Sequence, residues 1–268
     1  MKTPSDYHMH TPFCGHAHGG PADYIARARE LGMDELAITD HAPAPDGYDS
    51  GNRMDINGFP AYAATVGAYR DGSTPVVRFG IEADYYEGGT AFLADWLPRQ
   101  TFDIVLGSVH YIGDWPFDHP DHIASWNSKE TAWVWQRYFE LVARLADTRL
   151  YDVVAHLDLP KKFGHRADDA LLREAAAPAL DRLAAAGMSI ELNTSGLRRP
   201  CREIYPSLLL LTMAREREIS ITFGSDAHTP EDVGRGFAEA VTLARQAGYT
   251  HSARYAQRRK DLLPLPGE

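Results

Sequence analysis

Seven histidines and two carboxylates of this chain lie at or near the ends of short apolar runs. Imidazole nitrogens and carboxylate oxygens are the ligands that hold zinc, iron or manganese, and one carboxylate can bridge two ions. A single histidine on a strand is usually a core or surface residue, but packing does not account for so many at equivalent strand ends. The pattern predicts a site for two or three divalent transition-metal ions (zinc, iron or manganese). The predicted ligands are His8, His10, His16, His41, Glu82, His110, His156, Asp226 and His228.

Such a site favours hydrolysis of a phosphate monoester. A water or hydroxide shared between two cations has a much lowered pKa, and a further cation neutralises phosphate oxygens while the metal-bound hydroxide attacks phosphorus. We assign catalytic roles to His110, Asp226 and Asp40. Asp40 either protonates the leaving alkoxide or, as we favour, holds a ligand histidine by a hydrogen bond.

Basic side chains in two late loops predict the phosphate contacts. The basic pairs are Lys161-Lys162 and Arg198-Arg199. A guanidinium group binds phosphate with two parallel hydrogen bonds, although each pair could also be a solvated surface charge. Asn193 either orients the substrate or only ends its strand. The predicted substrate-binding residues are Lys161, Lys162, Asn193 and Arg198.

Two further features of the sequence each have two possible interpretations. The polar residues 118–122 are read as a turn in preference to a lid that recognises an imidazole or an amine. Cys14 lies between His10 and His16, and a ligand role for its sulfur is the less favoured interpretation.

The elements that must position these side chains alternate along the chain. Helical spacing, caps and terminal glycines predict helices over 21–31, 128–145, 168–186 and 231–247. Polar residues that gather at one end of successive strands favour a closed parallel barrel over an open sheet. We therefore expect an α/β fold, a distorted (β/α)7 TIM-like barrel with the site at its C-terminal face. The apolar runs typical of strands are 7–10, 36–39, 76–81, 104–109, 153–155, 190–192 and 219–225.

Composition sets the limits of this prediction. A chain of 268 residues with 44% hydrophobic content fits one barrel domain, 1–268, with a frayed tail at 258–268. The formal net charge of −10 argues against a nucleic-acid partner, because phosphate binding rests on Lys and Arg. Two cysteines make no disulfide framework, and neither a leader-like segment nor a long apolar run is found. We expect a cytoplasmic protein with a small phosphomonoester as its partner and no contact with membranes.

Several motifs together resemble the polymerase and histidinol phosphatase (PHP) family. The resemblance covers about residues 7–247 and is carried by 8–16, 39–41, 80–82, 107–110, 156–158 and 224–228. Segments 107–111, 156–163 and 193–198 look like the histidinol-phosphate phosphatase branch. The resemblance implies a hydrolase of histidine biosynthesis that converts L-histidinol phosphate to L-histidinol and phosphate.

The resemblance also implies how the ligands divide among three ions. Positions matching His8, His10, Glu82 and Asp226 bind the first ion in the family. The second ion takes Glu82, His110 and His156, and the third takes His16, His41 and His228. The family binds zinc, iron or manganese.

Four other functions remain as alternatives. The first is a PHP-type phosphoesterase for another substrate, such as a nucleotide, phosphotyrosine or a sugar phosphate. The second is a nuclease or proofreading module, which the acidic balance disfavours. A metal-binding protein without turnover is the third. The fourth is an amidohydrolase-type barrel, which usually has a lysine at the bridging position that Glu82 occupies here.

Overall fold

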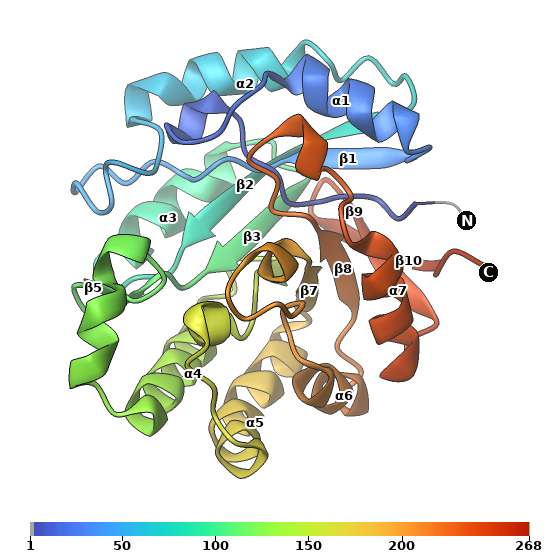
Figure 1. The fold of residues 1–268 in the computed structure, drawn as a ribbon. Coiled ribbons are helices and arrows are strands. Elements are labelled where there is room, and N and C mark those ends of the chain that lie inside the picture. Colours follow the sequence, from blue (N-terminus) through green and yellow to red (C-terminus); the bar gives the residue numbers. More distant parts are fainter. Residues whose placement is uncertain (1–2, 268) are drawn as a thin grey trace.

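The centre of the molecule is a curled parallel sheet, which a computed structural model describes within residues 3–267 (Figure 1). The strand order is β1-β2-β3-β6-β7-β8, so each strand lies beside the next one in the chain that belongs to this sheet. All five pairings are parallel. The C-terminal ends of all six strands therefore lie at the same end of the curled sheet. The strands are β1 (Glu35–Ile38), β2 (Val76–Asp84), β3 (Ile104–Ser108), β6 (Val153–Val154), β7 (Ser189–Asn193) and β8 (Ile221–Gly224).

Residues 6–10 lie between the two edge strands of this sheet. On the β8 side the amide of Tyr7 donates to the carbonyl of Phe223 at 2.9 Å. On the β1 side the amide of Ala37 donates to the carbonyl of Asp6 at 2.8 Å. The pairing consists of isolated bridges, so the predicted first strand is an extended segment and not a regular strand. The sheet thus has six strands, with a bonded segment between its edges.

Helices cover the outer face of the sheet (Figure 1). Residues 21–30 and 169–186 match two predicted helices, and the helix predicted from 128 begins at Thr131. The helix predicted from 231 begins only at Phe237, because Gly234 and Gly236 have φ values of 65° and 82°. The helices are α1 (Pro21–Glu30), α2 (Phe59–Gly67), α3 (Thr90–Trp96), α4 (Thr131–Thr148), α5 (Asp169–Ala186), α6 (Leu208–Glu216) and α7 (Phe237–Gln246).

The C-terminal segment corrects the expectation of a frayed tail. β9 (His251–Ala256) and β10 (Arg259–Pro264) form an antiparallel hairpin. The Arg258 guanidinium donates to both carboxylate oxygens of Asp152 at 3.0–3.2 Å, which ties the turn to the start of β6. Prolines at the end of the chain suggested fraying, but strand pairing and this ion pair order the segment.

The hairpin also completes a small core inside the curled sheet. Ala253 and Tyr255 pack with Tyr7, Ile104 and Val153 in a buried cluster separate from the large core under the helices. Full burial of a side chain such as Ile104 stabilises the fold by about 1.5–3 kcal/mol. The hairpin therefore covers the N-terminal end of the strands, opposite the end where the ligands gather.

A long connection of small elements links β3 to α4. β4 (Tyr111–Ile112) and β5 (Trp115–Pro116) form an antiparallel pair, and a 3-10 helix, η4 (Pro120–Ser128), follows them. Within the described part of the chain, no helix is both long enough and apolar enough to cross a membrane.

Candidate functional site

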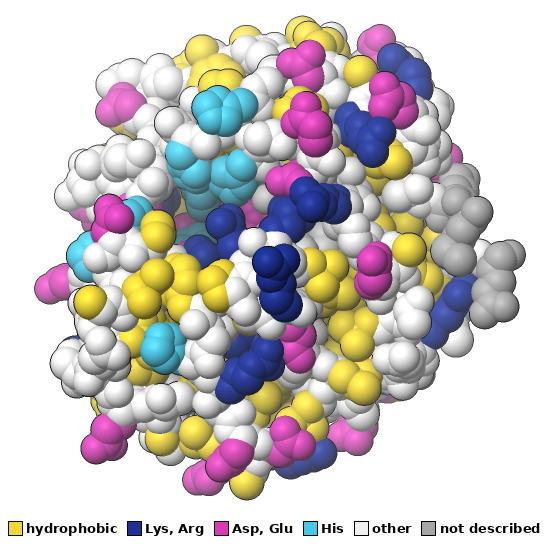
Figure 2. Space-filling view, viewed as in Figure 1, with side chains coloured by type: hydrophobic (Ala, Val, Ile, Leu, Met, Phe, Trp, Pro, Cys, Tyr) yellow, Lys and Arg dark blue, Asp and Glu magenta, His cyan; other side chains and the backbone are white. Residues whose placement is uncertain are grey.

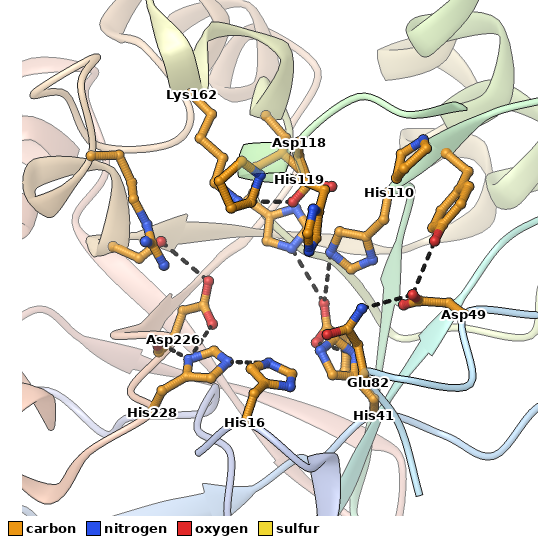
Figure 3. Close-up of a pocket in the computed structure, with 18 of the residues that line it drawn as sticks. His16, His41, Asp49, Glu82, His110, Asp118, His119, Lys162, Asp226 and His228 are labelled. Atoms are coloured by element: carbon orange, nitrogen blue, oxygen red, sulfur yellow. Dashed lines mark hydrogen bonds and ion pairs between the residues drawn. The ribbon is translucent and has the colours of Figure 1, made fainter. Parts of the chain in front are cut away.

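The C-terminal strand ends surround a cavity of about 420 Å³. Figure 2 shows its mouth as a hollow where histidine side chains gather beside lysine and arginine. Figure 3 shows ligand candidates from distant parts of the chain pointing toward one another. Predicted ligands that line the cavity are His16, His41, Glu82, His110, His156, Asp226 and His228, while His8 and His10 lie fully buried next to them.

Glu82 is the centre of the cluster. Its Oε1 lies 3.2 Å from His156 Nε2, and its Oε2 lies 3.2 Å from His8 Nε2. Oε2 is buried without a hydrogen-bond partner, although His10 Nε2 is only 3.3 Å away. Burial raises the pKa of the Glu82 carboxyl, but the interactions with the imidazoles of His41 and His8 outweigh burial and hold this pKa well below its ordinary value. An ionised carboxylate among imidazole nitrogens is suited to bridge cations.

Two carboxylates fix the orientation of two ligand histidines. Glu191 Oε1 lies 2.7 Å from His8 Nδ1, and Asp84 Oδ2 lies 2.9 Å from His110 Nδ1. An ionised carboxylate only accepts hydrogen bonds, so each Nδ1 carries a proton, and in the neutral imidazole that binds a metal each Nε2 presents a lone pair. Both Nε2 atoms face Glu82, at 3.2 Å for His8 and 3.7 Å for His110.

Backbone carbonyls do the same for two further histidines. His16 Nδ1 donates to the carbonyl of Cys14 at 3.0 Å, and His228 Nδ1 donates to the carbonyl of Asp226 at 3.1 Å. The Nε2 atoms of His16 and His228 then lie 2.9 Å apart. When both rings are neutral with Nδ1 protonated, two lone pairs face each other.

This spacing fits a shared metal ion. The Nε2 atoms of His8 and His10 are similarly close, at 3.0 Å. Two nitrogens that each lie about 2.0–2.1 Å from one ion are about 2.9 Å apart when they subtend a right angle. The unpartnered Glu82 Oε2 and the paired imidazole nitrogens therefore match a set of metal donors better than a set of ordinary hydrogen bonds.

Within residues 3–267 the donor atoms form three groups in which all atoms lie within 4.8 Å of one another. One group agrees with the expected first ion except for Asp226, one agrees with the expected second ion, and the third differs from the expected set of His16, His41 and His228. In the third group the Cys14 sulfur joins two imidazoles, while the His16 and His41 ring centroids are 5.8 Å apart. The groups are His8, His10 and Glu82; Glu82, His110 and His156; and His10, Cys14 and His228.

Two ligand candidates have unusual backbone conformations. Asp226 and His156 have φ values of 51° and 28°, in the left-handed region that side chains rarely adopt. Such strain persists at functional sites where surrounding contacts hold it. Burial raises the pKa of the Asp226 carboxyl, but His8 and His10 outweigh burial and keep it well below its usual range.

The structure corrects both roles predicted for Asp40. Its two oxygens accept from the backbone amide and the hydroxyl of Thr11, at 2.8 Å and 2.7 Å. The carboxyl is fully buried and does not line the cavity, so it neither reaches a leaving group nor bonds a ligand histidine. Burial raises its pKa to about 7. Asp40 instead fixes the chain that follows His10.

The two predicted substrate lysines have different surroundings. Lys162 lines the cavity, and its Nζ lies 2.9 Å from Asp118 Oδ2. Lys161 is buried outside the cavity, where its Nζ bonds Asp158 Oδ2 at 2.8 Å and the carbonyl of Ile204 at 2.7 Å. Lys161 therefore lies outside the cavity wall with its charge compensated within the fold, and a substrate contact for it stays a prediction.

The Asn193 loop also departs from expectation. Arg198 does not line the cavity and donates to the carbonyl of Ser225 at 2.9 Å, whereas its neighbour Arg199 lines the cavity. The Asn193 amide is fully buried and bonds Glu191 Oε2 at 3.0 Å and Asp226 Oδ2 at 3.4 Å. Neither Arg198 nor Asn193 contacts the cavity. Asn193 holds two carboxylates of the cluster in place.

Several functional neighbours had weak signals or none in the sequence. Glu191 is a charged residue inside an apolar strand, and Asp84 lies two residues after Glu82 on the same strand face. These two signals were available. Asp118 and Asp49 line the cavity from irregular segments, where no periodicity indicates orientation. Asp118 therefore belongs to the cavity wall, while a lid formed by 118–122, the less favoured interpretation, stays an alternative.

Comparisons with known proteins agree with this geometry. A family model described as "PHP domain" matches residues 6–195, and one described as "PHP-associated" matches 210–244. A "Probable histidinol-phosphatase" from Deinococcus radiodurans is 41% identical over 245 residues, covering 91% of this chain and 93% of the relative. A "Histidinol-phosphatase" from Bacillus subtilis is 27% identical, covering 87% and 96%.

One solved structure is similar over almost the whole chain. Histidinol phosphate phosphatase from Lactococcus lactis, complexed with zinc, L-histidinol and phosphate, gives a TM-score of 0.78 at 21% identity. The match covers 97% of this chain and 99% of that chain. It confirms the α/β fold with a curled parallel sheet.

Proposed function

The chain belongs to the PHP domain family, and from that premise we propose that it hydrolyses L-histidinol phosphate to L-histidinol and phosphate. The observation that carries the reaction class is the convergence of imidazoles, carboxylates and two basic side chains on one cavity. The substrate follows from relatives named histidinol-phosphatase that cover most of the chain. The reaction belongs to histidine biosynthesis.

The residues fit a site for two or three divalent cations, zinc, iron or manganese. His8, His10, Glu82 and Asp226 would hold one ion, and Glu82, His110 and His156 a second. For the third ion we keep the family's set of His16, His41 and His228: the Nε2 atoms of His16 and His228 are 2.9 Å apart, although the structure groups Cys14, and not His41, with His228. Bound cations would supply Lewis-acid stabilisation of the phosphate oxygens and would lower the pKa of a water molecule. The chain's own part is to orient the donors through Glu191, Asp84 and the carbonyls described above.

The remaining cavity wall supports a substrate with both charges. Lys162 and Arg199 present positive charge suited to phosphate oxygens. Asp49 and Asp118 add carboxylates, which suit the ammonium group of histidinol. Asp118 already pairs with Lys162 at 2.9 Å, so a phosphate that takes Lys162 frees Asp118 for a cation. A phosphomonoester without an ammonium group would use only the basic half of this wall.

Finer features of the prediction remain part of the proposal. We count residues 6–10 as the seventh unit of a distorted (β/α)7 barrel, since they bond to both edge strands. Residues 1–268 form one domain, and the enzyme acts in the cytoplasm on a small molecule, not on nucleic acid or membranes. The net charge of −10 supports the exclusion of nucleic acid.

Phosphate release from L-histidinol phosphate, measured on protein of known metal content, tests the proposal. A nucleotide, phosphotyrosine and a sugar phosphate serve as the comparison panel. We expect kcat/KM for histidinol phosphate to exceed that for the panel by roughly 100-fold or more, as a site with matched polar groups allows. Equal or faster release from a panel member would assign the chain to the alternative, a PHP-type phosphoesterase for another phosphomonoester.

A further inference from the structure

A loop between β1 and the 3-10 helix η2 (Ile56–Gly58) places a buried arginine beside the ligand cluster. The guanidinium of Arg53 has Nη2 3.3 Å from Asp84 Oδ2 and 3.3 Å from Asp49 Oδ2. Its Nη1 donates to the carbonyl of Ala42 at 3.0 Å, next to His41. A buried guanidinium costs several kcal/mol unless its charge is compensated. Here it contacts the groups that flank two ligand histidines.

Asp84 connects this arginine to the ligand cluster, because it contacts both Arg53 and His110. The carboxylate is buried, and its Oδ2 accepts from His110 Nδ1 and from the Tyr48 hydroxyl, each at 2.9 Å. Asp84 must stay in place to accept from His110 Nδ1 and so to orient Nε2 toward Glu82. Arg53 and Tyr48 supply the two other contacts of this oxygen.

Aromatic packing fixes the loop that carries both residues. The Tyr48 ring stacks on Tyr86 with centroids 3.8 Å apart, and the Arg53 guanidinium lies 4.8 Å from the Tyr48 ring centroid. Tyr111, which lines the cavity, donates its hydroxyl to Asp49 at 2.9 Å. These contacts fix the loop, so Arg53 in turn holds the Asp84 carboxylate in place.

We propose that Arg53 is a positioning residue, which holds Asp84 so that His110 presents Nε2 to the second metal position. The inference rests on the proposed function for the assignment of His110 as a ligand. Arg53 itself does not line the cavity. Its loss therefore weakens metal binding at that position before it changes the fold.

A titration of the apoprotein with zinc against a chromophoric chelator tests the role of Arg53. We expect Arg53→Met to weaken one zinc equivalent by about 10–100-fold, the range for loss of a partner behind a metal ligand. Arg53→Lys restores the charge but not both contacts and should give an intermediate value. Arg78→Met is the matched control, because Arg78 contacts buried Glu35 at 2.8 Å from the other end of β2.

Zinc affinities of Arg53→Met equal to those of Arg78→Met would overturn the proposal. If Arg53→Met does not fold, Tyr48→Phe decides, because it removes only one hydroxyl from the same Asp84 oxygen. A several-fold weaker zinc equivalent in Tyr48→Phe supports the role, and unchanged affinity contradicts it. Wild-type protein that binds zinc but releases no phosphate from histidinol phosphate would refute the proposed function alone, since the titration needs no substrate.

Discussion

The two ends of the curled sheet both hold buried charge, but they satisfy it in different ways. At the N-terminal strand ends, each of Glu35, Asp103 and Asp152 has an arginine partner. The Asp103 carboxylate also accepts from the amides of Phe79 and Gln257, both at 3.0 Å. At the C-terminal ends, Glu82 Oε2 has no hydrogen-bond partner, and imidazole lone pairs face one another.

This difference in hydrogen-bond partners distinguishes charged groups that stabilise the fold from charged groups that are available to bind a ligand. Buried polar groups are almost always hydrogen-bonded, so an exception needs a physical reason. At the N-terminal end the chain supplies every partner to these carboxylates. At the C-terminal end the partners fit cations from outside the chain. Changes at the two ends should therefore affect different properties.

The largest effect is expected from Glu82→Gln. The variant keeps the side-chain shape but removes the charge that faces two groups of imidazoles. Because loss of a partner behind a ligand costs about 10–100-fold, loss of the central carboxylate itself should cost more, on the order of 10⁴-fold in kcat/KM. Steady-state phosphate release and bound-metal content measure it. Activity within tenfold of wild type would refute the bridging role.

Metal removal should have the next largest effect, on stability. A ligand that binds only the folded chain adds about 4 kcal/mol at 1,000 times its Kd. For a domain of this size that corresponds to a fall in Tm of roughly 10 °C after chelation. Calorimetry before and after restoring zinc measures the change. Glu82→Gln is the control, and its Tm should respond much less to zinc. An unchanged wild-type Tm would mean that the cluster does not depend on cations.

The same contrast explains what the sequence could predict. Ligands at strand ends follow from alternating apolar runs, and the structure brings all nine predicted donors into one cluster. Side-chain direction in loops has no such rule, so Lys161 and Lys162 were indistinguishable although only Lys162 lines the cavity. Arg198 and Arg199 differ in the same way. The pattern of apolar residues predicts the strands, while tertiary contacts determine which loop side chains face the cavity.

The missed elements have a related cause. The hairpin of β9 and β10 depends on Arg258 reaching Asp152, which is 106 residues away in the sequence. The short helices α2, α3 and α6 have seven to nine residues, too few for a strong periodic signal. Both kinds of element are stabilised mainly by contacts that no local pattern shows.

A smaller effect is expected from Glu35→Gln at the N-terminal end. Glu35 is 1% exposed, accepts from Arg78 Nε at 2.8 Å and bonds the Tyr7 hydroxyl. Hydrogen bonds to charged groups contribute about 1.5–3 kcal/mol, so the free energy of unfolding should fall by about that amount. Denaturant unfolding measures this change. Zinc content and kcat/KM should stay at wild-type values, and a loss of zinc would break the division between the two ends.

Asp152→Asn should give the smallest effect, and its sign depends on pH. Burial raises the pKa of the Asp152 carboxyl above its ordinary value of 3.8, although Arg258 opposes the rise. Between those two pKa values the folded chain holds more of the proton than the unfolded chain. The contribution of Asp152 to stability therefore falls as pH rises from about 4. The asparagine variant cannot titrate, so the wild-type minus variant difference in unfolding free energy should decrease over that range. Unfolding curves at several pH values measure it. A difference that grows with pH would contradict the prediction and show that Arg258 more than compensates burial.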